Sequence, residues 1–207
     1  MIRQKRFASL ADLKGRPEWF LLLAVAYPFP NTLCKQNASS FALMKILYLL
    51  RHAKSSWSFD ELSDQERPLN DRGRDDAPLM GQALAKRRIC PDLVVSSPAV
   101  RAMSTAVLVA REMKYSHDKI VVEPGIYGAE VDELLAIIRG LPDAAGSVLL
   151  VGHNPTMTAT ANELSPSVLN EMPTAAVVCL RFECDHWAEV SKVNAEFYFY
   201  DYPRNVG

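Results

Sequence analysis

The sequence 46-ILYLLRH-52 decides the fold, because an unbroken apolar run passes directly into Arg51 and His52. A short run that is apolar at every position is typical of a parallel strand buried on both faces. Three further short apolar runs follow along the chain, at residues 93–96, 120–122 and 148–151. Helical patterns stand between and after these runs, at residues 71–87, 99–113, 131–139 and 155–163.

Alternating strands and helices imply a mostly parallel sheet with helices on both faces. Near the C-terminus, residues 175–182 and 189–200 read as two strands joined by a turn, which predicts an antiparallel hairpin. The sequence therefore predicts an α/β fold with three α/β/α layers, a mostly parallel sheet and an antiparallel C-terminal addition.

Local signals sharpen the expected helices. A polar loop, residues 55–70, ends at Asn70, which is a suitable N-cap for the first helix. Pro78 lies inside that helix and is expected either to kink it or to mark its true first turn. The second helix carries one apolar face that we expect to be buried: Met103, Ala106, Val107 and Ala110.

The net charge of −1 over 207 residues conceals two unequal regions. Residues 1–43 hold six Lys and Arg against two Asp and Glu, whereas residues 44–207 hold 17 against 22. An acidic body is a poor general binder of nucleic acid, because that affinity comes from neutralising phosphates. No apolar run approaches the roughly 20 residues of a membrane span, so neither nucleic acid nor a membrane is an expected partner. Four cysteines without paired spacing indicate a reducing, cytoplasmic location.

The change in composition at Met44 divides the chain into residues 1–43 and a domain of residues 44–207. We expect residues 1–43 to be a loosely ordered or dispensable N-terminal extension. Its apolar stretch, residues 19–27, matches a signal peptide poorly, because the basic part before it is long and contains acidic residues. A targeting segment and an element that docks on the domain are the two alternatives.

Three of the predicted strands end in residues that suit phosphate chemistry. Arg51 and His52 follow the first strand, Arg101 lies shortly after the second, and His153 follows the strand at residues 148–151. Because ligands of open α/β sheets bind beyond the carboxyl ends of the strands, we expect these four side chains to converge at one edge.

The residue types indicate what such a site does. Guanidinium groups offer forked donors that match phosphoryl oxygens. Imidazole, with an ordinary pKa of roughly 6.5, serves as a neutral nucleophile or as a charged donor. The sequence has no dense carboxylate cluster for a two-metal site, no P-loop and no G-x-S-x-G elbow. We therefore expect neither a metal nor another cofactor.

Four segments resemble the histidine phosphatase superfamily and stand in the order found there. They are 49-LLRHAKSSW-57, 67-RPLNDRG-73, 96-SSPAVRAMSTA-106 and 151-VGHNP-155. The similarity is closest to the SixA-type phosphohistidine phosphatase branch, and it implies a phosphoglycerate mutase-like fold. It also implies that His52 is the phosphorylated nucleophile and that Arg51, Arg101 and His153 bind the phosphoryl oxygens. The residues by themselves do not choose between His52 and His153 as the nucleophile.

Further residues are expected around these four. Ser58 stands where the mutases of the superfamily carry Asn, so we expect a weaker phosphate contact there. Arg67 is expected to bind phosphate at the rim or to pair with Asp64 or Glu66. Two acidic residues are candidates for a general acid, although they are most simply interpreted as the acidic first turn of a helix: Glu130 and Asp132.

The sequence thus predicts a cofactor-independent phosphatase that forms a covalent phosphohistidine on His52 and then passes the phosphoryl group to water. We expect a backbone carbonyl to hold the ring proton of His52, and protonated His153 to meet the charge on the phosphoryl group. A domain without an obvious lid insertion suits a phosphorylated protein side chain, and the resemblance implies phosphohistidine. The alternatives are a broad-specificity small-molecule phosphomonoesterase and, in a different class, a catalytically silent phosphate-sensing binding module.

Overall fold

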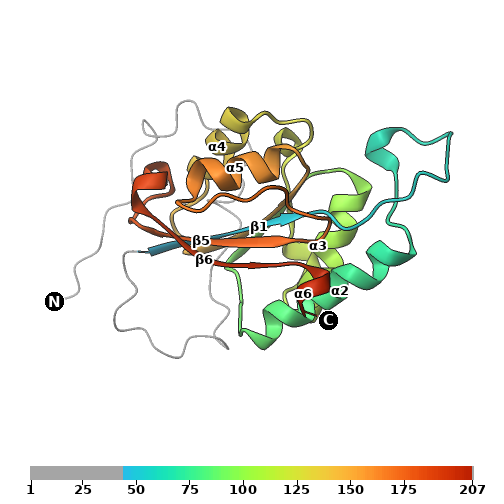
Figure 1. Ribbon diagram of the computed structural model, residues 1–207, viewed down its shortest axis with the longest axis horizontal. Coiled ribbons are helices and arrows are strands. Elements are labelled where there is room, and N and C mark those ends of the chain that lie inside the picture. The colour runs from blue at the N-terminus through green and yellow to red at the C-terminus, as the bar shows by residue number, and fades with distance from the viewer. Residues whose placement is uncertain (1–43, 207) are drawn as a thin grey trace.

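The computed structural model describes residues 44–206, so the prediction for residues 1–43 lies outside the described residues. Its sheet has six strands in the order β3-β2-β4-β1-β5-β6 (Figure 1). The strands are β1 Met44–Arg51, β2 Leu93–Ser96, β3 Val121–Val122, β4 Ser147–Gly152, β5 Val177–Glu183 and β6 Ala195–Asp201. The first four are parallel, β5 is antiparallel to β1, and β6 is antiparallel to β5. The predicted mixed sheet is confirmed.

Helices cover both faces of this sheet and make the three predicted layers (Figure 1). One face carries α4 and α5, and the other carries α2 and α3. The helices are α2 Asp71–Lys86, α3 Val100–Glu112, α4 Val131–Arg139, α5 Thr156–Leu164 and the short α6 Pro203–Val206. No helix within residues 44–206 combines the length and the apolar character needed to cross a membrane.

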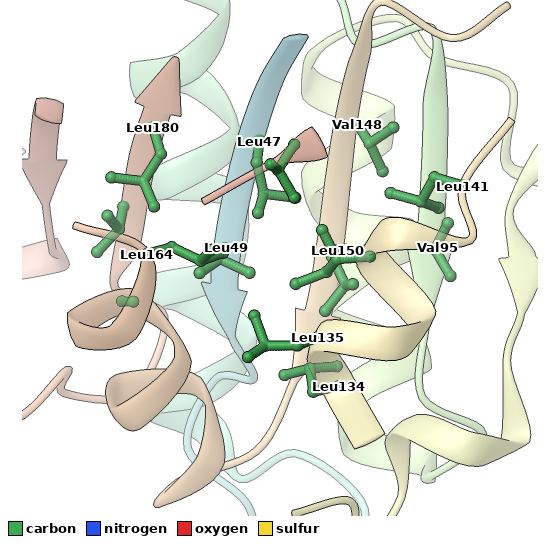
Figure 2. Packing of buried hydrophobic residues seen from close by; sticks show 14 of the residues in the cluster. Leu47, Leu49, Val95, Leu134, Leu135, Leu141, Val148, Leu150, Leu164 and Leu180 are labelled. Atoms are coloured by element: carbon green, nitrogen blue, oxygen red, sulfur yellow. The ribbon is translucent and has the colours of Figure 1, made fainter. Parts of the chain in front are cut away.

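Strand β1 shows why its apolar run is unbroken. Leu47 and Leu49 point into the layer formed with α4 and α5, part of which is shown in Figure 2. Tyr48 and Leu50 belong to the core on the other face, with α2 and α3. Because the strand is covered on both sides, consecutive residues from Leu47 to Leu50 are all buried, and the alternation seen in half-exposed strands is lost.

Helix α2 begins as the sequence predicts, with the Asn70 side chain accepting a hydrogen bond from the Gly73 amide at 2.9 Å. The helix continues through Pro78, so Pro78 does not mark its first turn. The face predicted for α3 was partly wrong. Met103 and Val107 are only half-buried, whereas the polar residues Arg101 and Thr105 are buried. Apolar periodicity does not predict the burial of these two polar residues, because the start of α3 faces the polar end of β1.

The prediction for the last strand was wrong at its start, since β6 begins at Ala195 rather than at residue 189. The preceding residues form two 3-10 turns, Trp187–Glu189 and Lys192–Asn194. Trp187 is completely buried and its indole N–H donates to the Ala145 carbonyl at 2.8 Å. This segment is therefore held by the burial of a large aromatic ring whose N–H is hydrogen-bonded, and not by pairing with a neighbouring strand.

Candidate active site

His52 lies at the carboxyl end of β1, where hydrogen bonds from three elements fix its backbone. Its N–H donates to the Gly152 carbonyl at 3.0 Å, and its carbonyl accepts from the Ala175 N–H at 3.2 Å. The next amide, that of Ala53, donates to the Thr105 hydroxyl of α3 at 2.9 Å. The position of the imidazole is thus set by β4, by the segment before β5 and by α3 together.

The two ring nitrogens of His52 have different partners. Nδ1 lies 2.7 Å from the Ala53 carbonyl oxygen, which only accepts hydrogen bonds, so Nδ1 carries the proton. Nε2 lies 3.3 Å from Nε of Arg101, which only donates, so Nε2 presents a lone pair. Burial lowers the pKa of His52 to about 3, helped by His153 and the arginines and opposed by the Ala53 carbonyl. At neutral pH this ring is uncharged and its tautomer is fixed.

Arg101 extends from the first turn of α3 and is 95% buried, so it is not a solvated helix residue. Besides its contact with His52, its Nη2 donates to Oδ2 of Asp64 at 2.7 Å, and its Nη1 donates to the Asp64 carbonyl. The Thr105 hydroxyl donates to the Arg101 carbonyl at 2.7 Å. Thr105 therefore links the backbone of Arg101 to that of Ala53, the residue after His52.

His153 follows β4, and its ring centroid lies 5.0 Å from that of His52. Its Nε2 is 2.7 Å from the Ser97 hydroxyl, and the Tyr127 ring meets it edge-on at 5.6 Å. Nδ1 is buried without a hydrogen-bond partner among residues 44–206. Burial and then Arg101 lower the pKa of His153 to about 4, against the opposing effect of Asp64. At pH 7 the ring of His153 is therefore neutral, and not protonated as expected from the sequence.

Arg51 ends β1 beside the histidines, but part of its guanidinium turns toward the segment before β5. Its Nη1 donates to the Met172 carbonyl at 2.6 Å and to Glu171 at 3.1 Å. The Glu171 side chain is 70% exposed. Nε of Arg51 is buried and has no partner within the described part of the chain.

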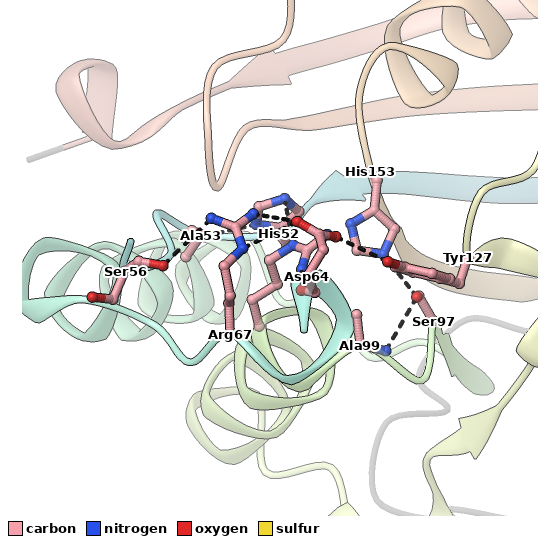
Figure 3. A network of polar contacts seen from close by, with 10 residues as sticks. His52, Ala53, Ser56, Asp64, Arg67, Ser97, Ala99, Tyr127 and His153 are labelled. Atoms are coloured by element: carbon pink, nitrogen blue, oxygen red, sulfur yellow. Dashed lines mark hydrogen bonds and ion pairs between the residues drawn. The ribbon is translucent and has the colours of Figure 1, made fainter. Parts of the chain in front are cut away.

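Of the two expectations for Arg67, the structure shows the ion pair with Asp64. Nε and Nη2 of Arg67 donate to Oδ1 of Asp64 at 3.0 and 2.7 Å, and the guanidinium lies 3.4 Å from the Trp57 ring centroid. Glu66 instead accepts from Ser63. Because Asp64 also contacts Arg101, Arg67 belongs to the same polar network as His52 (Figure 3).

Three predicted candidates contribute no side chain to this network. Ser58 is exposed, and its backbone N–H donates to the Ser56 hydroxyl at 3.1 Å. Glu130 is the exposed N-cap of α4 and forms a capping box with Glu133. Asp132 is exposed in the first turn of the same helix. The helix-start interpretation therefore accounts for both acidic candidates.

Sequence reasoning gave no site role to Asp64, Tyr127 or Ser97. Asp64 was considered only as a partner for Arg67, yet it also accepts from Arg101 and from the Tyr127 hydroxyl, at 2.9 Å. Burial raises the pKa of Asp64, but hydrogen bonds from Arg101, Tyr127 and Arg67 outweigh it and bring the pKa to about 2. The available signal was position, because Ser97 directly follows β2 and Tyr127 lies just beyond β3 at the same edge.

Comparison with known proteins agrees with this geometry. The sequence profile of the histidine phosphatase superfamily (branch 1) matches residues 47–127. A putative phosphohistidine phosphatase SixA from Agrobacterium tumefaciens superposes with a TM-score of 0.64 at 30% identity, covering 77% of this chain and 99% of that one. A putative phosphohistidine phosphatase SixA from Nakamurella multipartitia gives a TM-score of 0.65 at 28% identity, covering 77% of this chain and 96% of that one.

One curated relative is similar to this chain in sequence. An uncharacterized protein of Mycobacterium tuberculosis is 29% identical over 165 residues, which are 75% of this chain and all of the relative. The chain belongs to the histidine phosphatase superfamily and has its phosphoglycerate mutase-like fold. Within that superfamily it is SixA-like, and it is a phosphatase, a hydrolase of phosphorylated substrates.

Proposed function

We propose that this phosphatase hydrolyses phosphohistidine, or a related phosphorylated protein side chain, through a covalent phosphohistidine on His52. The observation that carries the proposal is the His52 ring itself. Its proton is fixed on Nδ1 by the Ala53 carbonyl, its Nε2 faces Arg101, and its pKa of about 3 keeps it neutral. A neutral imidazole of one tautomer is the form that attacks phosphorus.

The proposed reaction has two displacements. First, the Nε2 lone pair of His52 forms a bond to phosphorus while the bond from phosphorus to the leaving group breaks and the leaving group takes its electron pair. Water then attacks phosphorus, the bond to Nε2 breaks, and phosphate leaves with His52 restored. Arg101 and Arg51 are placed to meet the charge on the phosphoryl oxygens. A bound dianion would also favour the proton on His153.

The leaving group distinguishes the possible substrates. An alkoxide is a strong base and needs a proton as it departs, whereas the ring of phosphohistidine can be protonated beforehand and leave as neutral imidazole. The carboxyl group that contacts Arg101, Asp64, has a pKa of about 2 and is ionised, so it does not supply that proton. This supports a substrate that brings its own proton.

The rim of the site favours a macromolecular substrate. Trp57 and Phe59 are 71% and 46% exposed in the segment that also carries Asp64 and Arg67. Exposed aromatic rings beside the anion-binding residues suit a phosphorylated side chain presented on a protein surface. The similarity to two putative phosphohistidine phosphatases supports the same substrate.

Substrate competition tests the proposal. Purified full-length protein is assayed with a phosphohistidine protein, an aryl phosphate and phosphoserine at equal concentration. We expect fast turnover of the first two and slow turnover of phosphoserine, with rates that fall as the leaving-group pKa rises. A preference for small alkyl phosphates would identify a broad phosphomonoesterase instead. A phosphoenzyme burst without turnover would identify a binding module.

A further inference from the structure

The Asp64 carboxylate accepts hydrogen bonds from three side chains, as a small anionic ligand would. Arg101 donates to Oδ2 at 2.7 Å, Arg67 donates twice to Oδ1 at 2.7 and 3.0 Å, and the Tyr127 hydroxyl donates to Oδ2 at 2.9 Å. Figure 3 shows the side chains of Arg67 and Tyr127 reaching Asp64, and Arg101 reaches it from α3. Two guanidinium groups and a hydroxyl thus form an anion site, and a carboxylate of the chain occupies it.

This anion site lies beside the nucleophile. The guanidinium of Arg101 that binds Asp64 also donates through Nε to Nε2 of His52, at 3.3 Å. A phosphoryl group ready for attack must bring its phosphorus within about 3 to 3.5 Å of Nε2. Its oxygens would then need the same guanidinium, whose Nη1 and Nη2 are both engaged by Asp64.

We propose that Asp64 is an internal competitor for the phosphoryl group: it holds the anion site of Arg101, Arg67 and Tyr127 until a phosphorylated substrate displaces it. The inference rests on the proposed function, since it concerns the same site. Asp64 then determines the affinity of the site for other anions. To displace it, an incoming group must carry more charge and more acceptor oxygens than a carboxylate. A phosphoryl dianion, with three oxygens, meets that demand.

The local structure permits the displacement. Asp64 begins the 3-10 turn Asp64–Glu66 near the middle of the segment formed by residues 53–70, and its side chain is 49% exposed. Both ends of that segment are tied together, because the Ser56 amide donates to the Pro68 carbonyl at 2.8 Å and the Asn70 amide donates to the Lys54 carbonyl at 3.0 Å. The turn can therefore withdraw from Arg101 while the base of the segment stays closed.

The base is also close-packed against α2. A Cβ atom at Gly73 would lie 2.1 Å from the Lys54 carbonyl oxygen, so the helix and the start of the segment approach more closely than any other residue permits. This contact confines the movement to the exposed part of the segment.

Phosphate affinity tests the inference in the full-length protein. Inorganic phosphate is titrated calorimetrically into the wild type and into Asp64→Asn, which keeps the size of the side chain and removes its charge. We expect phosphate to bind about tenfold more tightly to Asp64→Asn, because the competing carboxylate is gone. Asp64→Glu, which keeps the charge, should stay closer to the wild type.

Asp60→Asn is the matched control, since Asp60 is an exposed carboxylate of the same segment. It makes the same change of net charge and should leave phosphate affinity within twofold. An equal gain in both Asn variants would reduce the effect to general electrostatics and overturn the inference. Weaker phosphate binding in Asp64→Asn would show that Asp64 holds the arginines in place, and unchanged binding would show that the two anions occupy different positions. Either result refutes it.

The same titration separates this inference from the proposed substrate. Tighter phosphate binding by Asp64→Asn, together with no hydrolysis of phosphohistidine by the wild type, would support the competitor and refute the substrate. The opposite pair of results would refute the competitor alone.

Discussion

Arginines stack on aromatic rings and pair with carboxylates at two places in this molecule. At the carboxyl edge of the parallel strands, Arg67 lies 3.4 Å from the Trp57 ring centroid and pairs with Asp64. On the antiparallel strands β5 and β6, Arg181 lies 3.1 Å from the Tyr198 ring centroid, and its ion-pair distance to Glu196 is 3.9 Å.

The two clusters differ in what surrounds the ion pair. Asp64 is shared by Arg67 and Arg101, and Arg101 reaches His52. At the antiparallel end, Arg181 of β5 pairs with Glu196 of β6, and Arg87, which follows α2, pairs with Asp201 of β6. An arginine, a ring and a carboxylate therefore do not by themselves define a site. The site arises where the ends of β1 and β4 bring two imidazoles together, and where one guanidinium, that of Arg101, contacts both His52 and Asp64.

The largest expected effect is the loss of the nucleophile. His52→Ala should reduce turnover of an aryl phosphate by at least about 10³-fold, since a covalent mechanism has no substitute for the attacking atom. Steady-state kinetics on the purified variant measure this, with circular dichroism to confirm the fold. Turnover within tenfold of the wild type would remove His52 from the mechanism.

Arginine substitutions at the two clusters sharpen the comparison. Arg101→Ala should lower kcat by about 10²- to 10³-fold, because it removes preorganised donors from the phosphoryl oxygens. Arg181→Ala, the matched change on the antiparallel strands, should leave kcat and KM within twofold. Equal losses in both variants would mean that the effect is structural and not catalytic.

The change in stability on acidification should have opposite signs for a histidine in each of the two regions. The pKa of His153 is lowered from 6.5 to about 4 in the folded protein, so the stability linked to it is complete above pH 6.5 and is lost as pH falls toward 4. Between pH 6.5 and 4.5, the free energy of unfolding of His153→Gln should therefore fall by about 1 to 2 kcal/mol less than that of the wild type. Urea denaturation at each pH measures this.

His186, in the connection between β5 and β6, provides the opposite case. Its hydrogen bond with Asp143 raises the pKa, so its contribution is present at acid pH and is lost as pH rises. The substitution His186→Gln should therefore lower the free energy of unfolding more at pH 5 than at pH 8. If both substitutions changed the pH dependence of stability in the same direction, the environments assigned to His153 and His186 would be contradicted.

The smallest expected effect concerns the acidic start of α4. Glu130→Gln and Asp132→Asn should change the rate with an aryl phosphate by less than about threefold, because both residues lie exposed at the helix start. Rates across leaving groups of different pKa are the measurement. A wild type with a flat dependence that turns steep in either variant would identify that carboxylate as the general acid.

The sequence predicted the parts of the site that depend on strand ends. The strand at residues 93–96 and the helix at residues 131–139 have the predicted bounds, and the residues that follow the strands meet at one edge as expected. The apolar runs carried this information because a strand buried on both faces is apolar throughout.

The parts that sequence reasoning missed depend on how a polar segment folds. The contact of Asp64 with Arg101 joins residues 37 positions apart, and that of Tyr127 with Asp64 joins residues 63 positions apart. Hydropathy does not encode such polar contacts. The same limit applies to Thr105, a polar residue on the buried face of α3.

The position of the phosphoryl label tests the central claim most directly. Full-length protein is mixed with a phosphohistidine substrate carrying labelled phosphate, quenched in base and digested, and the labelled residue is located by mass spectrometry. We predict an acid-labile, base-stable label on His52, absent from His52→Ala and still detectable in His153→Ala. A label on His153, or a label that persists in His52→Ala, would contradict the account.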